Sequence, residues 1–299
     1  MTTALTRPAA APVASPKRRR RAPGWLAVVP LLVFTAIAFG IPALAMLNGA
    51  FTVKDQATGA TSYTAGNLTT SLHGPYLTAL VGSVKLSAVS AALGTLLGLP
   101  LAQAVVSSRS RALREAVLTA SGVLANFGGV PLAFAFVATL GNAGVLTVHL
   151  GLADRGWSLY SFWGLVLVYL YFLIPLMVLT ITPALDGLRS QWREAARNNG
   201  ATAVQYWRHV ALPVLAPSLL GGLVLLFGSA FAAYATAAAM VGSAVPLVTL
   251  QIADAISGNV LVGQENVALA LSLDMVLVAG LVMAAYLPLQ RRSARWLDA

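Results

Sequence analysis

Six long apolar windows, separated by polar segments, constrain this 299-residue chain more than any other feature. The hydrocarbon core of a bilayer is about 30 Å thick, and a helix needs about 20 apolar residues to cross it. The chain is 58% hydrophobic and only 9% charged, which is unlike a soluble domain. We therefore predict an all-α integral membrane protein with six transmembrane helices. The windows are Gly24–Leu47, Tyr76–Ser108, Ala116–Gly141, Ser158–Thr182, Ser218–Val241 and Asn266–Leu289.

The first window has a second interpretation, a cleaved signal peptide. A basic stretch precedes it, and Ala43-Leu44-Ala45 matches the small-residue pattern of a cleavage site. The apolar run from Trp25 to Leu47 is, however, longer than the about 7–15 residues of a signal-peptide core, and five windows follow it. We expect residues 24–47 to remain as a transmembrane helix.

The segments outside the windows complete the domain organisation. The tail over residues 1–23 is rich in Ala, Pro and Arg, a composition typical of disorder. Residues 48–75 are polar and suit an external loop, and residues 76–289 form a core domain with five of the helices. A cytoplasmic loop over residues 184–217 lies within this core, and a cytoplasmic tail covers residues 290–299.

The distribution of Lys and Arg predicts the orientation in the membrane, because cytoplasmic loops carry an excess of these residues. With the N-terminus inside, 16 of the 19 Lys and Arg residues fall on the cytoplasmic side. Only Lys54 and Arg155 fall outside, and Lys85 lies within a span. Both termini are therefore predicted to be cytoplasmic. The net charge of +10 reports topology, and we expect no nucleic-acid partner.

The loop between the fourth and fifth windows is the most polar part of the core. It contains REAARNNGATAVQYWRHVALPVLAPSL, from Arg193 to Leu219. Gly200 is a natural helix stop, because glycine adopts a left-handed conformation without a steric penalty. A second short helix over Ala201–Val210 is expected to end before Pro213. Glu194 has a simple structural interpretation, an intrahelical ion pair with Arg197.

The spacing within this loop resembles a known motif. Glu194-Ala195-Ala196, three residues, Gly200, nine residues and then Val210-x-Leu212-Pro213 is similar to the EAA motif of permease subunits in binding-protein-dependent ABC importers of type I. The family's motif reads E-A-A, three residues, G, nine residues, I-x-L-P, and this chain departs from it only at Val210. The less specific resemblance covers about residues 76–289.

The resemblance implies a transport mechanism. The first short helix of the loop would be the coupling helix, which docks on a separate ATP-hydrolysing subunit. The implied partners are two ABC ATPase subunits, an external solute-binding protein and a second permease, which we expect to be a different chain although two copies of this one remain an alternative. The coupling residues would be Glu194, Ala195, Ala196, Gly200, Leu212 and Pro213.

ATP hydrolysis by this chain itself is not expected. A P-loop needs a Lys directly after its glycines, yet Lys17, Lys54 and Lys85 follow Pro16, Val53 and Val84. The chain has no Cys, and its three His residues are far apart in the sequence, so no metal site and no cofactor are expected. ATP and Mg²⁺ would be used by the partner ATPase.

Two charged residues lie inside predicted spans, where ionisable groups are rare and often functional. Lys85 and Asp274 lie nine and eight residues from the outer ends of their windows, which places them at similar depth. We predict an ion pair between them. The alternative places Asp274 on the translocation path.

Other polar residues inside spans are candidates for lining the path. Asn126 precedes Gly128, Gly129 and Pro131, a combination that can kink a membrane helix and expose backbone groups. The fifth window contains small residues at helical spacing, which suits close helix packing. The candidates for the path are Asn126, Ser229, Tyr234, Thr236 and Asp274.

The substrate class is less constrained by the sequence. The stretch SVKLSAVSAALGTLLGLPLA looks most like the branch of the family that handles polyamines, iron(III), thiamine, sulfate or phosphonates. Within it we expect a polyamine such as spermidine or putrescine, ahead of a phosphonate or an inorganic ion. The alternative function is an ion-coupled secondary transporter.

Overall fold

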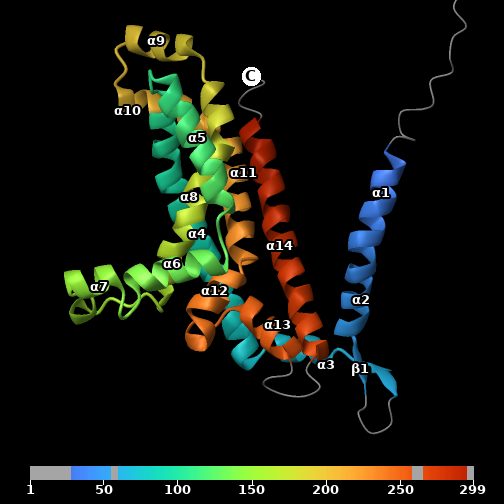
Figure 1. Cartoon of the computed structure of the whole chain (residues 1–299). Helices are drawn as coiled ribbons and strands as arrows, with labels where there is room; N and C mark the ends of the chain where they lie inside the picture. The colour runs from blue at the N-terminus through green and yellow to red at the C-terminus, as the bar shows by residue number, and fades with distance from the viewer. Residues whose placement is uncertain (1–27, 55–59, 258–264, 295–299) are drawn as a thin grey trace, which may run out of the picture. The chain divides into compact units, whose positions relative to one another are not determined.

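The computed structural model describes residues 28–54, 60–257 and 265–294 (Figure 1). The predictions for the tail over residues 1–23 and for the end of the C-terminal tail lie outside these residues. The chain divides into two compact units, with the boundary between Ala45 and Met46. The described part of the first unit is one apolar helical run, which comprises α1 (Val29–Thr35), a π-helical turn (Ala36–Gly40) and the start of α2 (Ile41–Ala50).

Six helical runs in the described part of the chain are long and apolar enough to cross a membrane. This confirms the prediction of an all-α membrane protein with six spans. The third run lies later in the chain than its predicted window, and the fifth run begins and ends earlier than its window. The runs are Val29–Ala50, Gly74–Val106, Val130–Leu150, Phe162–Asp186, Ala203–Phe231 and Glu265–Gln290.

The core of the second unit is built around α4 (Gly74–Val106) and α8 (Phe162–Asp186). These helices approach closely because α4 carries glycine at positions 94 and 98. A Cβ atom on Gly98 would lie 2.6 Å from Met177 Cβ, and one on Gly94 would lie 2.9 Å from Leu226 Cδ2. Glycines four residues apart allow membrane helices to pack backbone to side chain, and this pair brings α4 against both α8 and α11 (Leu212–Phe231).

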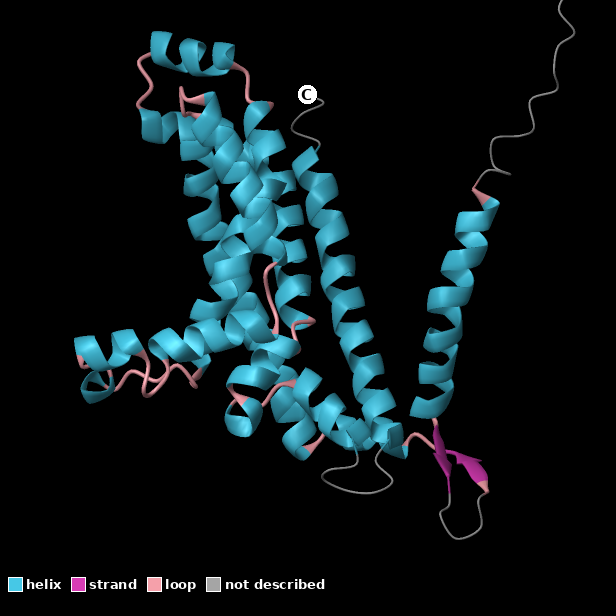
Figure 2. Ribbon diagram, in the orientation of Figure 1, coloured by secondary structure: helices cyan, strands magenta, loops and turns pink. Residues whose placement is uncertain are grey.

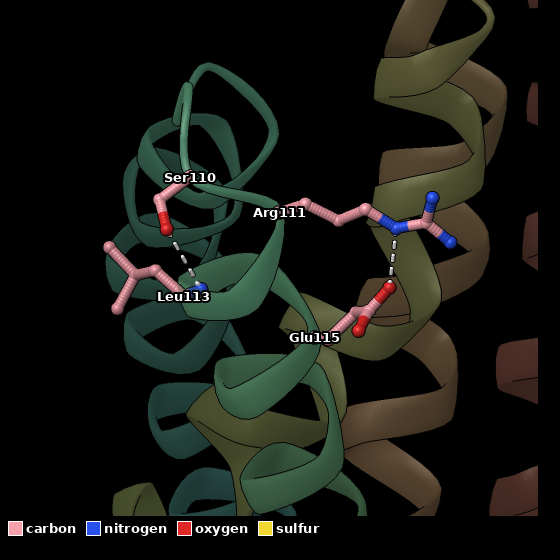
Figure 3. Close-up of polar contacts among 4 residues, drawn as sticks. All are labelled: Ser110, Arg111, Leu113 and Glu115. Carbon is pink, nitrogen blue, oxygen red and sulfur yellow. Dashed lines mark hydrogen bonds and ion pairs between the residues drawn. The ribbon is translucent and has the colours of Figure 1, made fainter.

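Helix α5 (Arg111–Asn126) begins at a short polar turn (Figure 3). The Ser110 hydroxyl accepts a hydrogen bond from the Leu113 N–H at 3.3 Å, and the Arg111 guanidinium contacts the Glu115 carboxylate at 2.7 Å. Arg114 forms an ion pair with Asp186 at the end of α8. The start of α5 is therefore joined to the end of α8 by charge as well as by packing.

The third predicted span is not one helix. Helix α5 ends at Asn126, and α6 (Val130–Leu140) and α7 (Val145–Leu150) lead away from the bundle in Figure 1. Gly129 has φ +78°, which a residue with a side chain rarely adopts. The prediction of a continuous helix over 116–141 is therefore wrong, because the Gly-Gly-Val-Pro sequence ends one helix and starts another.

The fifth predicted span begins earlier and ends earlier than expected. Helix α10 (Ala203–Tyr206) passes through a π-helical turn (Trp207–Ala211) into α11, and α12 (Ala235–Met240) is separate. The predicted stop before Pro213 is wrong. Proline is tolerated in the first turn of a helix, and the preceding π-helical turn carries the chain through to α11.

The predicted loop over residues 48–75 is ordered where the structure describes it. It contains a hairpin of β1 (Thr52–Lys54) and β2 (Thr61–Tyr63), shown in magenta in Figure 2, and the short helix α3 (Gly66–Ser71). The Asn67 side-chain amide donates to Ala50 O and Thr52 O at 3.2 and 2.8 Å. The Asn266 amide donates to Thr52 O at 2.7 Å, so this region is attached to the start of α14 (Glu265–Ala294).

One helix between the fifth and sixth spans was not predicted. Helix α13 (Val248–Ser257) packs against α4 and α14, and its Val248 N–H donates to Ser83 Oγ at 2.9 Å. Two short 3-10 turns, Ala153–Arg155 and Gly242–Ala244, complete the described elements of the second unit together with α9 (Ser190–Asn198).

The two ends of the bundle in the second unit carry different elements. Helix α9, the start of α5 and the last turns of α14 lie at one end in Figure 1, and α3 and α13 lie at the other. The helices thus alternate in direction along the chain, as the predicted path through a membrane requires.

Candidate functional site

The polar loop between α8 and α11 forms a sharp elbow. Helix α9 ends at Asn198, and Gly200, two residues later, has φ +76°. The Ala201 N–H donates to Ala196 O and the Gly200 N–H donates to Arg197 O, both at 2.9 Å. These two bonds form a Schellman motif, which closes the helix end and fixes the direction of the following chain. The predicted role of Gly200 as a helix stop is therefore present.

The second arm of the elbow starts from a capping box. The Thr202 hydroxyl accepts from the Gln205 N–H at 3.3 Å, and the Gln205 side-chain oxygen accepts from the Thr202 N–H at 2.8 Å. The reciprocal bonds satisfy backbone donors that a helix start otherwise leaves free. The Schellman motif ends at Ala201 and the capping box begins at Thr202, so no unbonded residue remains between α9 and α10.

A cation–π contact braces the elbow. The Arg193 guanidinium carbon lies 5.5 Å from the centroid of the Tyr206 ring, and Tyr206 is buried. Such contacts contribute about 0.5–1 kcal/mol at exposed sites. Arg193 projects from α9 and Tyr206 ends α10, so the contact joins the two arms directly.

Glu194 lies on the first arm of this elbow, in α9. Its side chain is exposed, and it forms no ion pair with any residue of the described chain. The intrahelical pair with Arg197 is therefore absent. The next two residues are small: Ala195 is exposed and Ala196 is half-buried. Neither has a side chain large enough to cover the Glu194 carboxylate. Leu212 and Pro213 are exposed at the start of α11.

A cleft of about 400 Å³ lies where the chain of the third and of the fifth predicted span is interrupted, after α5 and after α11. Figure 2 shows the two interruptions as pink loops within the lower half of the bundle. Four of the five predicted path residues line this one cleft, although they come from different elements of the chain. They are Asn126, Ser229, Tyr234 and Thr236.

The two interrupted spans are bonded to each other at this cleft. The Gly129 N–H donates to Thr236 Oγ1 at 2.9 Å, and the Thr236 hydroxyl donates to Gly129 O at 3.3 Å. The Tyr169 hydroxyl on α8 donates to Ala233 O at 3.1 Å. Backbone groups freed by a broken helix must be satisfied within the protein at membrane depth, and these side chains satisfy them.

The Asn126 side chain forms its hydrogen bond within its own helix and not with a neighbouring helix. Its side-chain amide donates to Gly122 O on its own helix at 2.8 Å, and the side chain is exposed. Asn126 lines the cleft from the last turn of α5, so the amide is bonded within its helix while it faces the predicted path.

We expect Thr236→Val to destabilise the protein by about 1–3 kcal/mol, because valine has a similar shape but leaves Gly129 N–H and C=O without their partner. Thr236→Ser should retain most of the stability. Thermal unfolding of the purified protein in detergent measures the difference. Equal unfolding temperatures for the Val and Ser variants would show that the Thr236 hydroxyl does not stabilise the interrupted helix at Gly129.

The predicted ion pair between Lys85 and Asp274 is absent. Asp274 is 4% exposed and lies against the Ser71 hydroxyl of α3, and its Oδ2 has no hydrogen-bond partner in the described chain. Lys85 is exposed and lines a different pocket. The prediction fails because α11 packs against both α4 and α14, so equal depth does not make the two side chains neighbours. Asp274 also does not line the cleft.

Comparison with known proteins identifies the family. The model of the family described as "Binding-protein-dependent transport system inner membrane component" matches residues 94–296. The chain belongs to this family. It is a permease subunit of an ABC importer and a multi-pass membrane protein.

Named relatives of this permease differ in substrate. The molybdenum transport permease ModB of Mycobacterium tuberculosis is 31% identical over 210 residues, which cover 69% of this chain and 76% of that protein. The spermidine/putrescine permease PotC of Haemophilus influenzae is 36% identical over 67 residues, covering 22% of this chain and 26% of that protein. Membership in this family supports an ABC importer permease and argues against the alternative function, an ion-coupled secondary transporter.

A solved structure shows the same fold. A bacterial ABC transporter that imports the acidic polysaccharide alginate matches this permease with a TM-score of 0.65 at 17% identity, over 91% of this chain and 94% of that chain. At this identity the likeness supports the fold alone. The sequence predicted a kink near Gly128 and Gly129 but not the full break of the helix there, and the close packing at Gly94 and Gly98 was not predicted, although the Gly-Gly and Gly-x-x-x-Gly patterns signal both.

Proposed function

We propose that this permease imports a tetrahedral oxyanion and couples its movement to ATP hydrolysis through the elbow formed by α9 and α10. The observation that carries the coupling is the combination of a braced elbow and a free carboxylate. A Schellman turn, a capping box and the Arg193–Tyr206 contact hold the elbow, and Glu194 remains exposed without an ion pair among the described residues.

The physical argument for coupling rests on stiffness. Helix α10 runs without a break through the π-helical turn into α11, so a displacement of the elbow reaches the cleft-lining Ser229 along one continuous helix. A flexible loop would absorb the displacement. We infer that α9 docks on a separate ATPase subunit, with Glu194 as an acceptor for a donor on that subunit and with Ala195 and Ala196 allowing close approach.

The assembly that follows from this proposal has several chains. Two ATPase subunits bind ATP and Mg²⁺ and dock on the elbows of two permeases. An external solute-binding protein delivers the substrate. A second permease, which we propose to be a different chain, completes the path. In this arrangement the elbow and both termini of the chain are cytoplasmic, as the distribution of Lys and Arg indicates.

The oxyanion proposal has two supports. The resemblance to a molybdenum permease extends over 69% of the chain, whereas that to a polyamine permease covers 22%. The residues lining the cleft include no charged side chain, and they present the amide of Asn126 and the hydroxyls of Ser229 and Tyr234, whereas the Thr236 hydroxyl is bonded to Gly129 O. Neutral hydrogen-bond groups suit an oxyanion, whereas a polycation is bound best with carboxylates. We therefore prefer an oxyanion to the polyamine predicted from the sequence.

The coupling proposal is tested with Glu194→Ala in the complex purified with its ATPase in lipid nanodiscs. We expect ATP hydrolysis to lose its stimulation by loaded binding protein by at least about tenfold, since a charge-assisted hydrogen bond at an interface contributes about 1.5–3 kcal/mol. Glu115→Ala is the matched control, because Glu115 is also an exposed carboxylate at the same end of the bundle but is paired with Arg111. Normal stimulation in Glu194→Ala would overturn the proposal.

The substrate proposal is tested by uptake into proteoliposomes containing the complete importer. We expect radiolabelled molybdate or sulfate to accumulate in an ATP-dependent manner, and excess spermidine not to compete. Accumulation of spermidine, with no competition from either oxyanion, would restore the polyamine assignment.

A further inference from the structure

Lys85 has no role in the cleft or the elbow, yet it lies in a defined pocket. The pocket has a volume of about 520 Å³ and lies between α4, the start of α8 and the segment after α12. Lys85 is exposed to it. Thr78 and Ser161 are the other polar lining residues, and the remainder are Leu77, Val81, Gly82, Phe162, Ala244, Val245 and Pro246.

The Lys85 ammonium has no counter-charge within the described chain. The ion pairs there join Arg111 to Glu115 and Arg114 to Asp186, both at the opposite end of the bundle from the start of α4. A charged side chain at membrane depth is expensive and normally has a partner or reaches the interface. The missing counter-charge of Lys85 therefore lies outside the described residues, and an anion from outside the chain would supply it.

The depth of Lys85 indicates where that anion lies. Helix α4 has 33 residues and is about 50 Å long, which exceeds the about 30 Å of the hydrocarbon core. Lys85 is eleven residues after Gly74, about 16 Å from the start of the helix. If the excess length is shared between the two ends, Lys85 lies roughly 6 Å below the edge of the core, and its flexible stem allows the ammonium to reach the headgroup level.

The hydroxyl groups of the pocket argue against a site for a free oxyanion. The Thr78 hydroxyl donates to Gly74 O at 3.2 Å, and the Ser161 hydroxyl donates to Ser158 O at 2.7 Å. Both protons are thus used within the protein, and the Lys85 ammonium is the free side-chain donor among the lining residues. One cation above an apolar wall matches a molecule with one anionic group and a hydrocarbon tail.

We propose that this pocket binds a phospholipid, with the lipid phosphate on the Lys85 ammonium. An acyl chain lies along the apolar wall that includes Leu77, Val81 and Phe162. The backbone of Pro246 is held close to α4 because residue 82 is glycine, where a Cβ would lie 2.4 Å from Pro246 O. This contact places Val245 and Pro246 beside α4 and completes the wall. The lipid thereby joins α4 to the segment that follows the cleft-lining α12.

The test is native mass spectrometry of the full-length purified permease, titrated with phosphatidylglycerol. A basic residue near the membrane surface contributes about 1 kcal/mol to the binding of an anionic lipid, so Lys85→Gln should weaken the tightest lipid site about fivefold. Lys85→Arg should bind nearly as wild type. Arg155→Gln is the matched control, because it removes a positive charge from an exposed residue of the loop that precedes α8.

Three further arms identify the occupant. Diacylglycerol, which lacks the phosphate, should bind wild type and Lys85→Gln equally. Ala244→Trp, which fills the pocket without changing charge, should also weaken the tightest site, with unchanged thermal unfolding as the control for folding. Equal phosphatidylglycerol affinity in wild type and Lys85→Gln, displacement of the lipid by millimolar inorganic phosphate, or a crosslink from Lys85 to a carboxylate of a neighbouring permease would each overturn the proposal.

Discussion

Gly200→Val is expected to abolish transport while the protein still inserts and folds. Gly200 has φ +76°, a conformation that costs a residue with a Cβ about 1–2 kcal/mol and a β-branched residue more. Relief of this strain requires the Schellman turn to open, which releases the angle between α9 and α10. Uptake and stimulated ATP hydrolysis by the reconstituted importer measure the loss.

Two variants control for the effect of Gly200→Val. Gly200→Asn should retain substantial transport, because asparagine tolerates the left-handed conformation at a helix end. Gly280→Val adds the same side chain at a glycine of α14 that lacks positive φ and has open space around it, and it should transport normally. A Gly200→Val importer as active as Gly280→Val would show that the angle of the elbow does not matter for coupling.

Gly98→Leu is expected to prevent folding of the second unit. Even a Cβ atom at this position would lie 2.6 Å from Met177 Cβ, 2.8 Å from Met177 Cγ and 3.3 Å from Ile174 O. Met177 is fully buried in α8, so neither helix can yield locally. The destabilisation should reach or exceed the about 1–3 kcal/mol typical of overpacked cores. Loss of the monodisperse peak in size-exclusion chromatography after detergent extraction is the expected result.

Gly122→Leu is the matched control for this second prediction. Gly122 also lies within a helix of the bundle, α5, but a Cβ atom added there would meet no other atom within 4 Å. This variant should be extracted as a single folded species. The double variant Gly98→Leu with Met177→Ala should recover part of the folded yield, because it removes the main obstacle. A folded Gly98→Leu protein would show that α4 and α8 can separate without loss of structure.

The spans and the elbow were predictable because their signals are local. Runs of about 20 apolar residues have no stable alternative to a helix in a bilayer, and the spacing from Glu194 to Pro213 lies within one short segment. Four cleft residues were also identified, because polar residues are rare enough in apolar windows for each to be noticed. Their convergence on one cleft was not contained in that reasoning.

The ion pair shows where local reasoning stops. Lys85 and Asp274 were paired by depth, a coordinate along the helix axis, whereas contact also requires the right neighbour and the right rotation. In the structure α11 lies against both helices, Asp274 is buried against Ser71 and Lys85 faces its own pocket. A single sequence carries no information on which helices are adjacent.

Short stretches of sequence were enough to predict the membrane environment, the number of spans, the family motif and the position of Gly200 at the turn of the elbow. Hydrophobicity and backbone freedom belong to single residues or short windows, so they act before any packing occurs. The packing of the helices, by contrast, brings Gly129 to Thr236 and Arg193 to Tyr206, and it leaves Lys85 without a counter-charge among the described residues. These relations depend on the rotation and adjacency of helices, which arise from the packing of many side chains at once.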